Sequence, residues 1–312
     1  MNATSLHDWH LARGAKMAPF AGYDMPISYP TGAVEEHLIC RRSVGLFDID
    51  HMGQVELSGP GADGFVSGLV SARVEDMLVG EARYSLLLDP SGFVLDDIFV
   101  YRLRTSWWIV INASNRASDI AWMRGRAPKG VAIDDRSDDT YMIAVQGPRA
   151  IELMDAAAGG HSVSALRRFT SGDIVVEGTS ILFGRTGYTG EDGGELFFSA
   201  AKALELWELL LAKSSEFGIE AAPIGLAARD SLRFEAGMPL HGHEISPSIN
   251  PIEAGFKWAC DFTKDFGGKK AVEAVVASGP SRRLVGLDVT GGVPREGFPV
   301  LTPPEGAEVG SC

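Results

Sequence analysis

The sequence predicts an α+β fold built from antiparallel sheets, and three observations support this prediction. Runs of β-branched and aromatic residues alternate with helical patterns in no strict βαβ rhythm, which disfavours a doubly wound parallel sheet. Glycine-rich turns, rather than long helices, separate the strands expected at 173–177, 180–183 and 195–198. The 312 residues, 45% of them hydrophobic, are enough for about two domains with sizeable cores.

The remaining elements follow from the period of the apolar residues. Apolar residues at helical spacing predict helices at 5–13, 33–42, 62–70, 116–124, 203–217, 224–236 and 269–278. Alternating or continuous apolar runs predict strands at 44–50, 54–58, 84–88, 93–101, 106–112, 141–146 and 283–289. The turn residues at 90–92 (Pro-Ser-Gly) join 84–88 to 93–101 as an antiparallel hairpin.

The composition changes near Gly279 and Pro280, and this change divides the chain. We expect residues 1–278 to form two interleaved α+β units and residues 279–312 to begin a small β unit. Because one or two strands cannot close a sheet or bury a core, we expect this last unit to be incomplete.

Charge and cysteine content exclude several classes of protein. A formal net charge of −13 without a basic patch disfavours nucleic acid and anionic membranes as partners. Cys40, Cys260 and Cys312 form no Cys-x-x-Cys pair, so neither a disulfide framework nor a metal site is expected. The N-terminus has no targeting pattern, and no window approaches the roughly 18 apolar residues of a membrane span. We therefore expect a cytoplasmic protein, or one of a mature organelle matrix.

Asp96 and Asp97 stand inside the apolar strand expected at 93–101, where carboxylates are rarely found. Because side chains alternate along a strand, the two acids are predicted to point to opposite faces. This geometry disfavours a dyad that shares a proton between them and favours one functional and one structural carboxylate. Asp97 shares its face with Tyr101. Two purely structural acids are the alternative at this point.

The segment 184–195 holds five glycines in its first eleven positions. This indicates a loop whose backbone lies close to another group. It lacks the Gly-Lys-Ser/Thr of a phosphate-binding loop, and a strand rather than a helix follows it, which excludes a dinucleotide fingerprint. Tyr188 at the tip and Glu195 at the mouth of the strand place an aromatic face beside a carboxylate. A carboxylate accepts two parallel N–H bonds from a flat amidine-like edge, as in a pterin or guanine. A plain hairpin turn is the alternative.

Other residues can be interpreted as functional or as structural. Arg229 and Arg233 share one helix face at i, i+4, so either can meet a ligand carboxylate or pair with acids of its own helix. His51 is interpreted as a structural histidine with satisfied hydrogen bonds, and Met52 as a core residue. Trp258 is by default a core aromatic with its N–H satisfied. No Ser/His/Asp, Cys/His or metal-ligand arrangement is visible.

Six short motifs, taken together, resemble the aminomethyltransferase (T-protein) family of the glycine cleavage system. They occur in family order along about residues 5 to 301, at 14–22 (GAKMAPFAG), 42–48 (RSVGLFD), 51–53 (HMG), 96–97 (DD), 185–193 (RTGYTGEDG) and 225–230 (GLAARD). The resemblance implies three domains around a central tetrahydrofolate cavity, two of them α+β and the third a C-terminal β-barrel. Residues 279–312 would then begin the barrel.

The resemblance also implies a reaction. A methylene group passes from the aminomethyl-lipoyl arm of the H-protein to tetrahydrofolate, and ammonia is released. The catalytic acid of the family falls on Asp97, whose implied role is to orient the folate and assist its N5 through hydrogen bonding and charge. The implied folate contacts are Met52, Tyr84, Tyr101, Asn112, Tyr188, Glu195, Arg229 and Trp258.

Two other functions stay open from the sequence. A relative on the same fold can demethylate a small sulfonium, amine or aryl ether onto tetrahydrofolate, and His241, where the family usually has tyrosine, favours this alternative. A non-enzymatic folate-binding protein of the kind that assists iron–sulfur cluster assembly is the second. Such proteins carry a Lys-Gly-Cys-x-x-Gly-Gln motif where this chain has 236–244 (AGMPLHGHE), without a cysteine.

Overall fold

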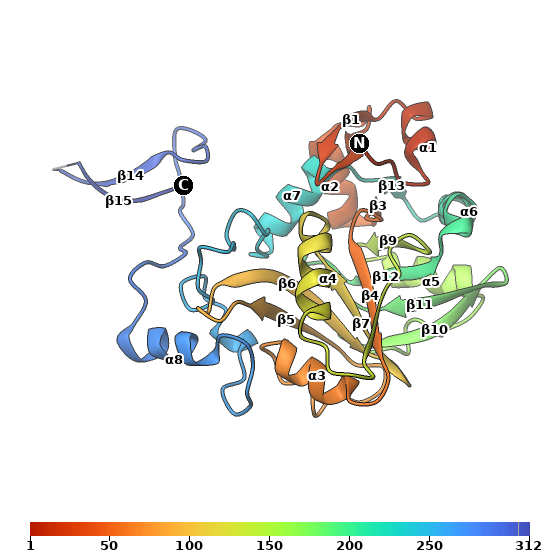
Figure 1. Ribbon diagram of the computed structural model, residues 1–312. Coiled ribbons are helices and arrows are strands. Elements are labelled where there is room, and N and C mark those ends of the chain that lie inside the picture. Colours follow the sequence, from red (N-terminus) through yellow and green to blue (C-terminus); the bar gives the residue numbers. More distant parts are fainter. Residues whose placement is uncertain (305) are drawn as a thin grey trace.

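The computed structural model describes residues 1–304 and 306–312, and it contains two large sheets with helices packed on them (Figure 1). The first sheet has five strands, all antiparallel to their neighbours. Their spatial order is β5 (Ala82–Leu88), β6 (Val94–Arg102), β7 (Ser106–Ile111), β4 (Gly53–Ser58) and β8 (Ala132–Asp135). Two helices cover one face of it, α3 (Ala62–Leu69) and α4 (Arg116–Arg124).

The second sheet has six strands, antiparallel except for the short β13, which runs parallel to β3. Their spatial order is β10 (Ser171–Val176), β11 (Thr179–Gly184), β12 (Gly193–Ser199), β9 (Thr140–Gln146), β3 (Val44–Asp48) and β13 (Ala221–Pro223). The helices α5 (Ala150–Ala158) and α6 (Ala203–Glu216) share a hydrophobic core with one face of this sheet.

The opposite faces of the two sheets meet in a further core, which positions the candidate site. Tyr101 of β6 and Phe197 of β12 contribute to this core, and their ring centroids are 5.5 Å apart. The helix α7 (Leu226–Glu235) adds Ala228 and Leu232 to it. Residues near the ends of β6, β7, β12 and α7 therefore come close together although they are far apart in sequence.

Smaller elements complete the structure. They are α1 (His7–Ala12), the hairpin of β1 (Lys16–Phe20) and β2 (Tyr23–Ser28), α2 (Ala33–Arg42), α8 (Lys269–Ser278) and the hairpin of β14 (Pro299–Thr302) and β15 (Ala307–Ser311), with short 3-10 turns at Ala113–Asn115, Ala200–Lys202 and Lys257–Ala259. In Figure 1 the last hairpin, in blue, projects away from the sheets. Within the described residues, no helix is both long and apolar enough to cross a membrane.

The α+β prediction with antiparallel sheets is confirmed, and the predicted hairpin at 84–101 forms β5 and β6. The strand predicted at 283–289 is wrong, because this segment is irregular. Leu284, Val285 and Leu287 are more than half exposed, so neither face has a core to pack against. The C-terminal barrel stays a prediction, since β14 and β15 form only a two-stranded sheet among the described residues.

Six strands were not predicted: β1, β2, β8, β13, β14 and β15. Prolines in β1, β2 and β13 disfavour strand by propensity, and these strands lie in a separate hairpin or at a sheet edge, where a missing N–H is tolerated.

Candidate active site

Asp96 and Asp97 lie in the middle of β6, and their burial alternates as the strand pattern predicts. Asp96 is fully buried on the face that packs against α3 and α4, whereas Asp97 is partly exposed on the other face. The amide of Asn112, just after β7, nevertheless reaches both acids. Its Nδ2 donates to Asp96 Oδ1 at 2.9 Å and to Asp97 Oδ1 at 2.8 Å. The two acids are therefore linked through one side chain.

The second oxygen of Asp97 faces an aromatic pair. Tyr84 Oη donates to Asp97 Oδ2 at 3.2 Å, and the Tyr84 ring stacks on Trp258 with centroids 5.4 Å apart. Burial and the neighbouring charge of Asp96 raise the pKa of Asp97, while the hydrogen bonds from Asn112 and Tyr84 oppose the rise. The interpretation of Trp258 as a core residue is wrong, because its side chain is 68% exposed.

Glu195 at the start of β12 holds a second carboxylate close to the same core. Thr186 Oγ1 and Tyr101 Oη both donate to its Oε2, at 2.6 and 3.1 Å. Among the described residues no donor reaches Oε1, so one carboxylate oxygen is left available to a ligand. Burial raises the pKa of Glu195, and the two hydroxyl donors act against this rise. Tyr101 itself is fully buried, so its hydroxyl group holds the Glu195 carboxylate from within the core.

One glycine of the glycine-rich segment is required by this packing. A Cβ on Gly184 would lie 2.7 Å from Cε1 and 2.9 Å from Oη of Tyr101. Any side chain at this position would push Tyr101 away from Glu195. The sequence signal of a close backbone approach therefore refers here to an internal contact and not to a phosphate.

The two arginines of α7 have different surroundings. Arg233 is buried and pairs with Asp230 and Glu244, each at 2.8 Å, so it is structural. No carboxylate in the described part of the chain lies within ion-pair distance of Arg229. Its guanidinium lies over the Tyr188 ring, with Cζ 4.6 Å from the centroid. Burial lowers the pKa of Arg229, and the charge of Glu195 acts in the opposite direction.

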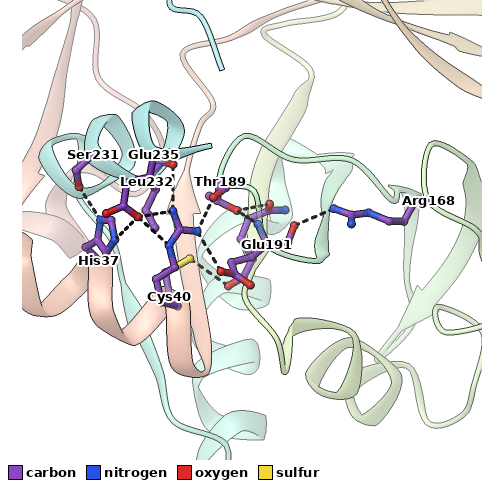
Figure 2. A network of polar contacts seen from close by, with 10 residues as sticks. His37, Cys40, Arg168, Thr189, Glu191, Ser231, Leu232 and Glu235 are labelled. Carbon is purple, nitrogen blue, oxygen red and sulfur yellow. Dashed lines mark hydrogen bonds and ion pairs between the residues drawn. The ribbon is translucent and has the colours of Figure 1, made fainter. Parts of the chain in front are cut away.

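A polar network holds the loop that carries Tyr188 (Figure 2). Arg41 of α2 donates to the carbonyl of Thr189 at 2.6 Å and to Glu191 at 3.1 Å. The same guanidinium pairs with Glu235 of α7 at 3.0 Å. Tyr188 Oη also donates to the carbonyl of Pro239. The loop is thus tied to two helices before any ligand binds.

His51 and Met52 follow β3 and lie beside this core. Met52 is partly buried and packs against the cluster that contains Tyr101. The interpretation of His51 as a satisfied histidine is wrong. It is buried, neither ring nitrogen has a hydrogen-bond partner in the described residues, and its ring packs edge-on against Phe20 at 5.4 Å. Burial lowers the pKa of His51 to about 3, so the ring is neutral.

A buried Asp-His pair, which was not predicted, lies near the N-terminus. His10 Nε2 is 2.9 Å from Asp48 Oδ2, and its Nδ1 is 2.8 Å from Tyr29 Oη. Burial disfavours the charge, but hydrogen bonds from His10 and Thr4 outweigh it and lower the pKa of Asp48. The His10 ring and the Asp48 carboxylate are both buried, so the pair connects α1 to β3.

Most of the predicted site residues lie in three contacting groups, namely Asp97 with Asn112, Tyr84 and Trp258, Tyr101 with Glu195, and Arg229 with Tyr188. Burial and, to a smaller extent, the charge of Asp97 raise the pKa of Tyr188, and the charge of Glu195 opposes the lowering of the Arg229 pKa. Sequence reasoning missed three polar neighbours, namely Asn115, Asp119 and Thr186. The signal for Asp119 was an acid beside the apolar residues of a predicted helix.

The model of the GCVT N-terminal domain family matches residues 6–264, which is most of the chain. The chain belongs to this family. The family predicted from six ordered motifs is therefore confirmed.

Named relatives agree over nearly the whole chain. An aminomethyltransferase of Symbiobacterium thermophilum is 41% identical over 310 residues, covering 96% of this chain and 82% of the relative. One of Herpetosiphon aurantiacus is 41% identical over 315 residues, covering 99% and 84%. The crystal structure of the glycine cleavage system aminomethyltransferase T from Bartonella henselae matches with a TM-score of 0.90 and 35% identity, covering 99% of this chain and 84% of that one.

Proposed function

We propose that this chain is the aminomethyltransferase of a glycine cleavage system. It transfers the methylene group of an aminomethyl-lipoyl arm to tetrahydrofolate, releases ammonia and yields 5,10-methylenetetrahydrofolate. The observation that carries the proposal is Asp97, a partly exposed carboxylate held by Asn112 and Tyr84. Relatives at about 40% identity over almost the same length bear this activity as their name.

The chemistry of the site fits a reduced folate. Glu195 Oε2 accepts hydrogen bonds from Tyr101 and Thr186, whereas Oε1 accepts none among the described residues. A carboxylate with a free oxygen suits the flat N–H edge of a pterin. Tyr84, Trp258 and Tyr188 offer ring faces for aromatic groups. Arg229 has no ion-pair partner in the described chain and suits the carboxylates of a folate tail. Asn112, Met52 and Tyr101 complete the contacts that we propose.

Asp97 acts on charge and orientation rather than as a nucleophile. Each of its oxygens already accepts one hydrogen bond, and a carboxylate has room for more. We propose that it accepts from an N–H of the bound folate and stabilises the positive charge that develops when the folate nitrogen attacks the methylene carbon. Such preorganised groups raise the rate because they are in place before the reaction starts.

We also propose the lipoylated H-protein as the partner that delivers the aminomethyl group, with a cytoplasmic location, as the bacterial origin of the relatives supports. The competing demethylase function would use the same folate pocket with a free small donor. A non-enzymatic folate binder would hold folate without transfer. The two enzymatic functions differ in the donor that they consume, and the non-enzymatic function consumes none.

A donor competition assay tests the proposal. The purified chain is supplied with tetrahydrofolate and either aminomethylated H-protein or a panel of small sulfonium, amine and aryl ether donors. We expect methylenetetrahydrofolate and ammonia with the H-protein alone. Turnover of a small donor without the H-protein would support the demethylase, and tight folate binding without turnover of any donor would support the non-enzymatic protein.

A further inference from the structure

Asp96 is a fully buried carboxylate that binds three N–H groups. Its side chain is 0% exposed, and none of the ion pairs in the described part of the chain includes it. The backbone N of Asn112 donates to Asp96 Oδ2 at 2.9 Å. The Nδ2 atoms of Asn112 and Asn115 donate to Oδ1, at 2.9 and 2.7 Å. These N–H groups offset the cost of burying the carboxylate.

The same contacts determine the orientation of the Asn112 amide. Its Nδ2 also lies 2.8 Å from Asp97 Oδ1 and 3.2 Å from the backbone carbonyl oxygen of Asp97. All three neighbours of this nitrogen are oxygens of a carboxylate or a carbonyl, which only accept hydrogen bonds. If the amide were turned over, its oxygen would face these oxygens without a hydrogen between them. The amide therefore has one orientation, with its NH₂ group towards the acids.

The position of Asn112 explains why one amide reaches two acids that point apart. β6 and β7 are antiparallel, with Phe99 opposite Val110. Continuing this register places Asn112, just after β7, opposite Asp97. The backbone N–H and the Nδ2 of Asn112 both reach the carboxylate of Asp96 on the other face of β6. Two points of attachment to Asp96 fix the direction of the amide, and Asp97 accepts from the same nitrogen.

A second asparagine supports the Asp96 carboxylate. Asn115 lies in the 3-10 turn after β7, and its Nδ2 also donates to the backbone carbonyl of Leu95 at 3.3 Å. The same nitrogen is 3.2 Å from His241 Nδ1. Because an amide nitrogen only donates, His241 Nδ1 is the acceptor in this contact. Two side chains and one backbone N–H thus hold Asp96 in place.

We propose that Asp96 is a positioning residue, which fixes the orientation of the Asn112 amide and through it the Asp97 carboxylate. The chain of contacts is continuous, because Nδ2 of Asn112 donates to Oδ1 of both acids. The two adjacent acids then have different tasks, since Asp97 is partly exposed whereas Asp96 is not. This inference deepens the proposed function and rests on it only for the role of Asp97.

The orientation of the amide also decides what Asn112 offers to a ligand. With its NH₂ group directed at the two acids, its Oδ1 receives no donor among the described residues. Asn112 therefore presents a hydrogen-bond acceptor, which suits an N–H group of a bound folate. A turned amide would present a donor at the same place.

Asp96→Asn tests this dependence. An amide has one acceptor and one donor, so an NH₂ group at position 96 would face at least one of the three N–H groups that donate to the wild-type carboxylate. We expect the Asn112 amide to lose its fixed orientation. As a result, kcat should fall by roughly 10- to 100-fold, while the Kd for tetrahydrofolate changes by at most about fivefold.

Asp155→Asn is the matched control. Asp155 on α5 also accepts from two backbone N–H groups, those of Val163 at 2.9 Å and Ser164 at 3.2 Å. The helix α5 packs on the face of the second sheet that is opposite to the candidate site. We expect kcat of this variant to stay within about twofold of the wild type. Thermal unfolding of each variant confirms that it is folded.

A double-mutant cycle separates action through Asn112 from an independent effect. Asn112→Ala removes the amide that the two acids share. If Asp96 acts through this amide, adding Asp96→Asn to Asn112→Ala should lower kcat by no more than about threefold further. Losses that multiply in the double variant would overturn the proposal, as would wild-type kcat in a folded Asp96→Asn variant.

Side-chain amide NMR of the full chain tests the orientation without any activity, and its wild-type arm does not depend on the folding of Asp96→Asn. The NH₂ signals of Asn112 are assigned by their loss in Asn112→Ala. We expect slow hydrogen exchange of these signals in the wild type and fast exchange in Asp96→Asn. Fast exchange in the wild type, or slow exchange that persists in Asp96→Asn, would refute the inference. Failure of aminomethyl transfer in the wild type would refute only the proposed function.

Discussion

Asp97→Asn is the substitution that isolates charge at the candidate site. Asp97 Oδ1 accepts from Asn112 at 2.8 Å and Oδ2 accepts from Tyr84 Oη at 3.2 Å. The carbonyl of the substituted amide can still accept from Asn112. Its NH₂ can donate to the Tyr84 hydroxyl, which can accept as well as donate. The substitution therefore keeps the contacts and removes one negative charge.

The expected loss is large in kcat and small in binding. Removing one preorganised group that stabilises developing charge reduces kcat by about 10²- to 10³-fold, or roughly 2.7–4 kcal/mol. Most folate contacts lie elsewhere, at Glu195, Arg229 and the ring faces, so the Kd for tetrahydrofolate should rise by at most about tenfold, or ~1.4 kcal/mol.

Stability should not fall. The pKa of Asp97 is raised in the folded protein, so its contribution to stability is present below the unfolded pKa of about 3.9 and is lost as the pH rises towards the folded pKa. At neutral pH an amide at this position should leave the free energy of unfolding equal or higher.

Single-turnover transfer from aminomethylated H-protein, with folate binding followed separately by fluorescence, measures both quantities. Thermal unfolding of Asp97→Asn serves as the control for folding. Transfer at a near-normal rate by a folded variant would refute the role assigned to Asp97. A loss confined to folate binding would reassign Asp97 as a binding residue.

Three further predictions follow from the site and its supports. Glu195→Gln removes charge from the bonds to the pterin edge, so the Kd for tetrahydrofolate should rise by about 10- to 100-fold in a titration, and a Kd unchanged within twofold would contradict the pterin assignment. Arg41→Met should release the loop 187–193, so limited proteolysis there should be faster and the KM for folate higher. The control Arg42→Met loses only exposed ion pairs with acids, so the proteolysis rate and the KM should not change. His51 has a pKa lowered to about 3, so the unfolded state binds more protons between that value and 6.5 and wild-type stability falls on acidification through this range. In His51→Leu, denaturant unfolding should show this fall reduced by about 1 kcal/mol per pH unit, and an unchanged slope would exclude His51 as its source.

Elements with a strong apolar period could be predicted from sequence, whereas pairing across the chain could not. The hairpin of β5 and β6 combines alternating apolar residues with a Pro-Ser-Gly turn, and both signals are local. The parallel pairing of β13 with β3 joins residues almost 180 positions apart through a segment with a proline. The segment 283–289 shows the opposite error, because an apolar strand pattern alone forms no strand without a partner to pair with.

In the candidate site, too, local features could be predicted from sequence, whereas contacts between distant segments could not. Alternation along β6 separated Asp96 from Asp97, but it could not show that Asn112 joins them from the end of another strand. Thr186 was missed because its role depends on which carboxylate packs against it. The identities of the folate contacts came from family resemblance and stay predictions.

The measurement that tests the central claim most directly is the stoichiometry of a single turnover. Aminomethylated H-protein, labelled with ¹³C in its aminomethyl carbon, is mixed with tetrahydrofolate and an excess of the purified chain. The account predicts one 5,10-methylenetetrahydrofolate carrying the label and one ammonia for each aminomethyl group consumed. Folded chain that binds tetrahydrofolate but leaves the label on the H-protein would contradict it.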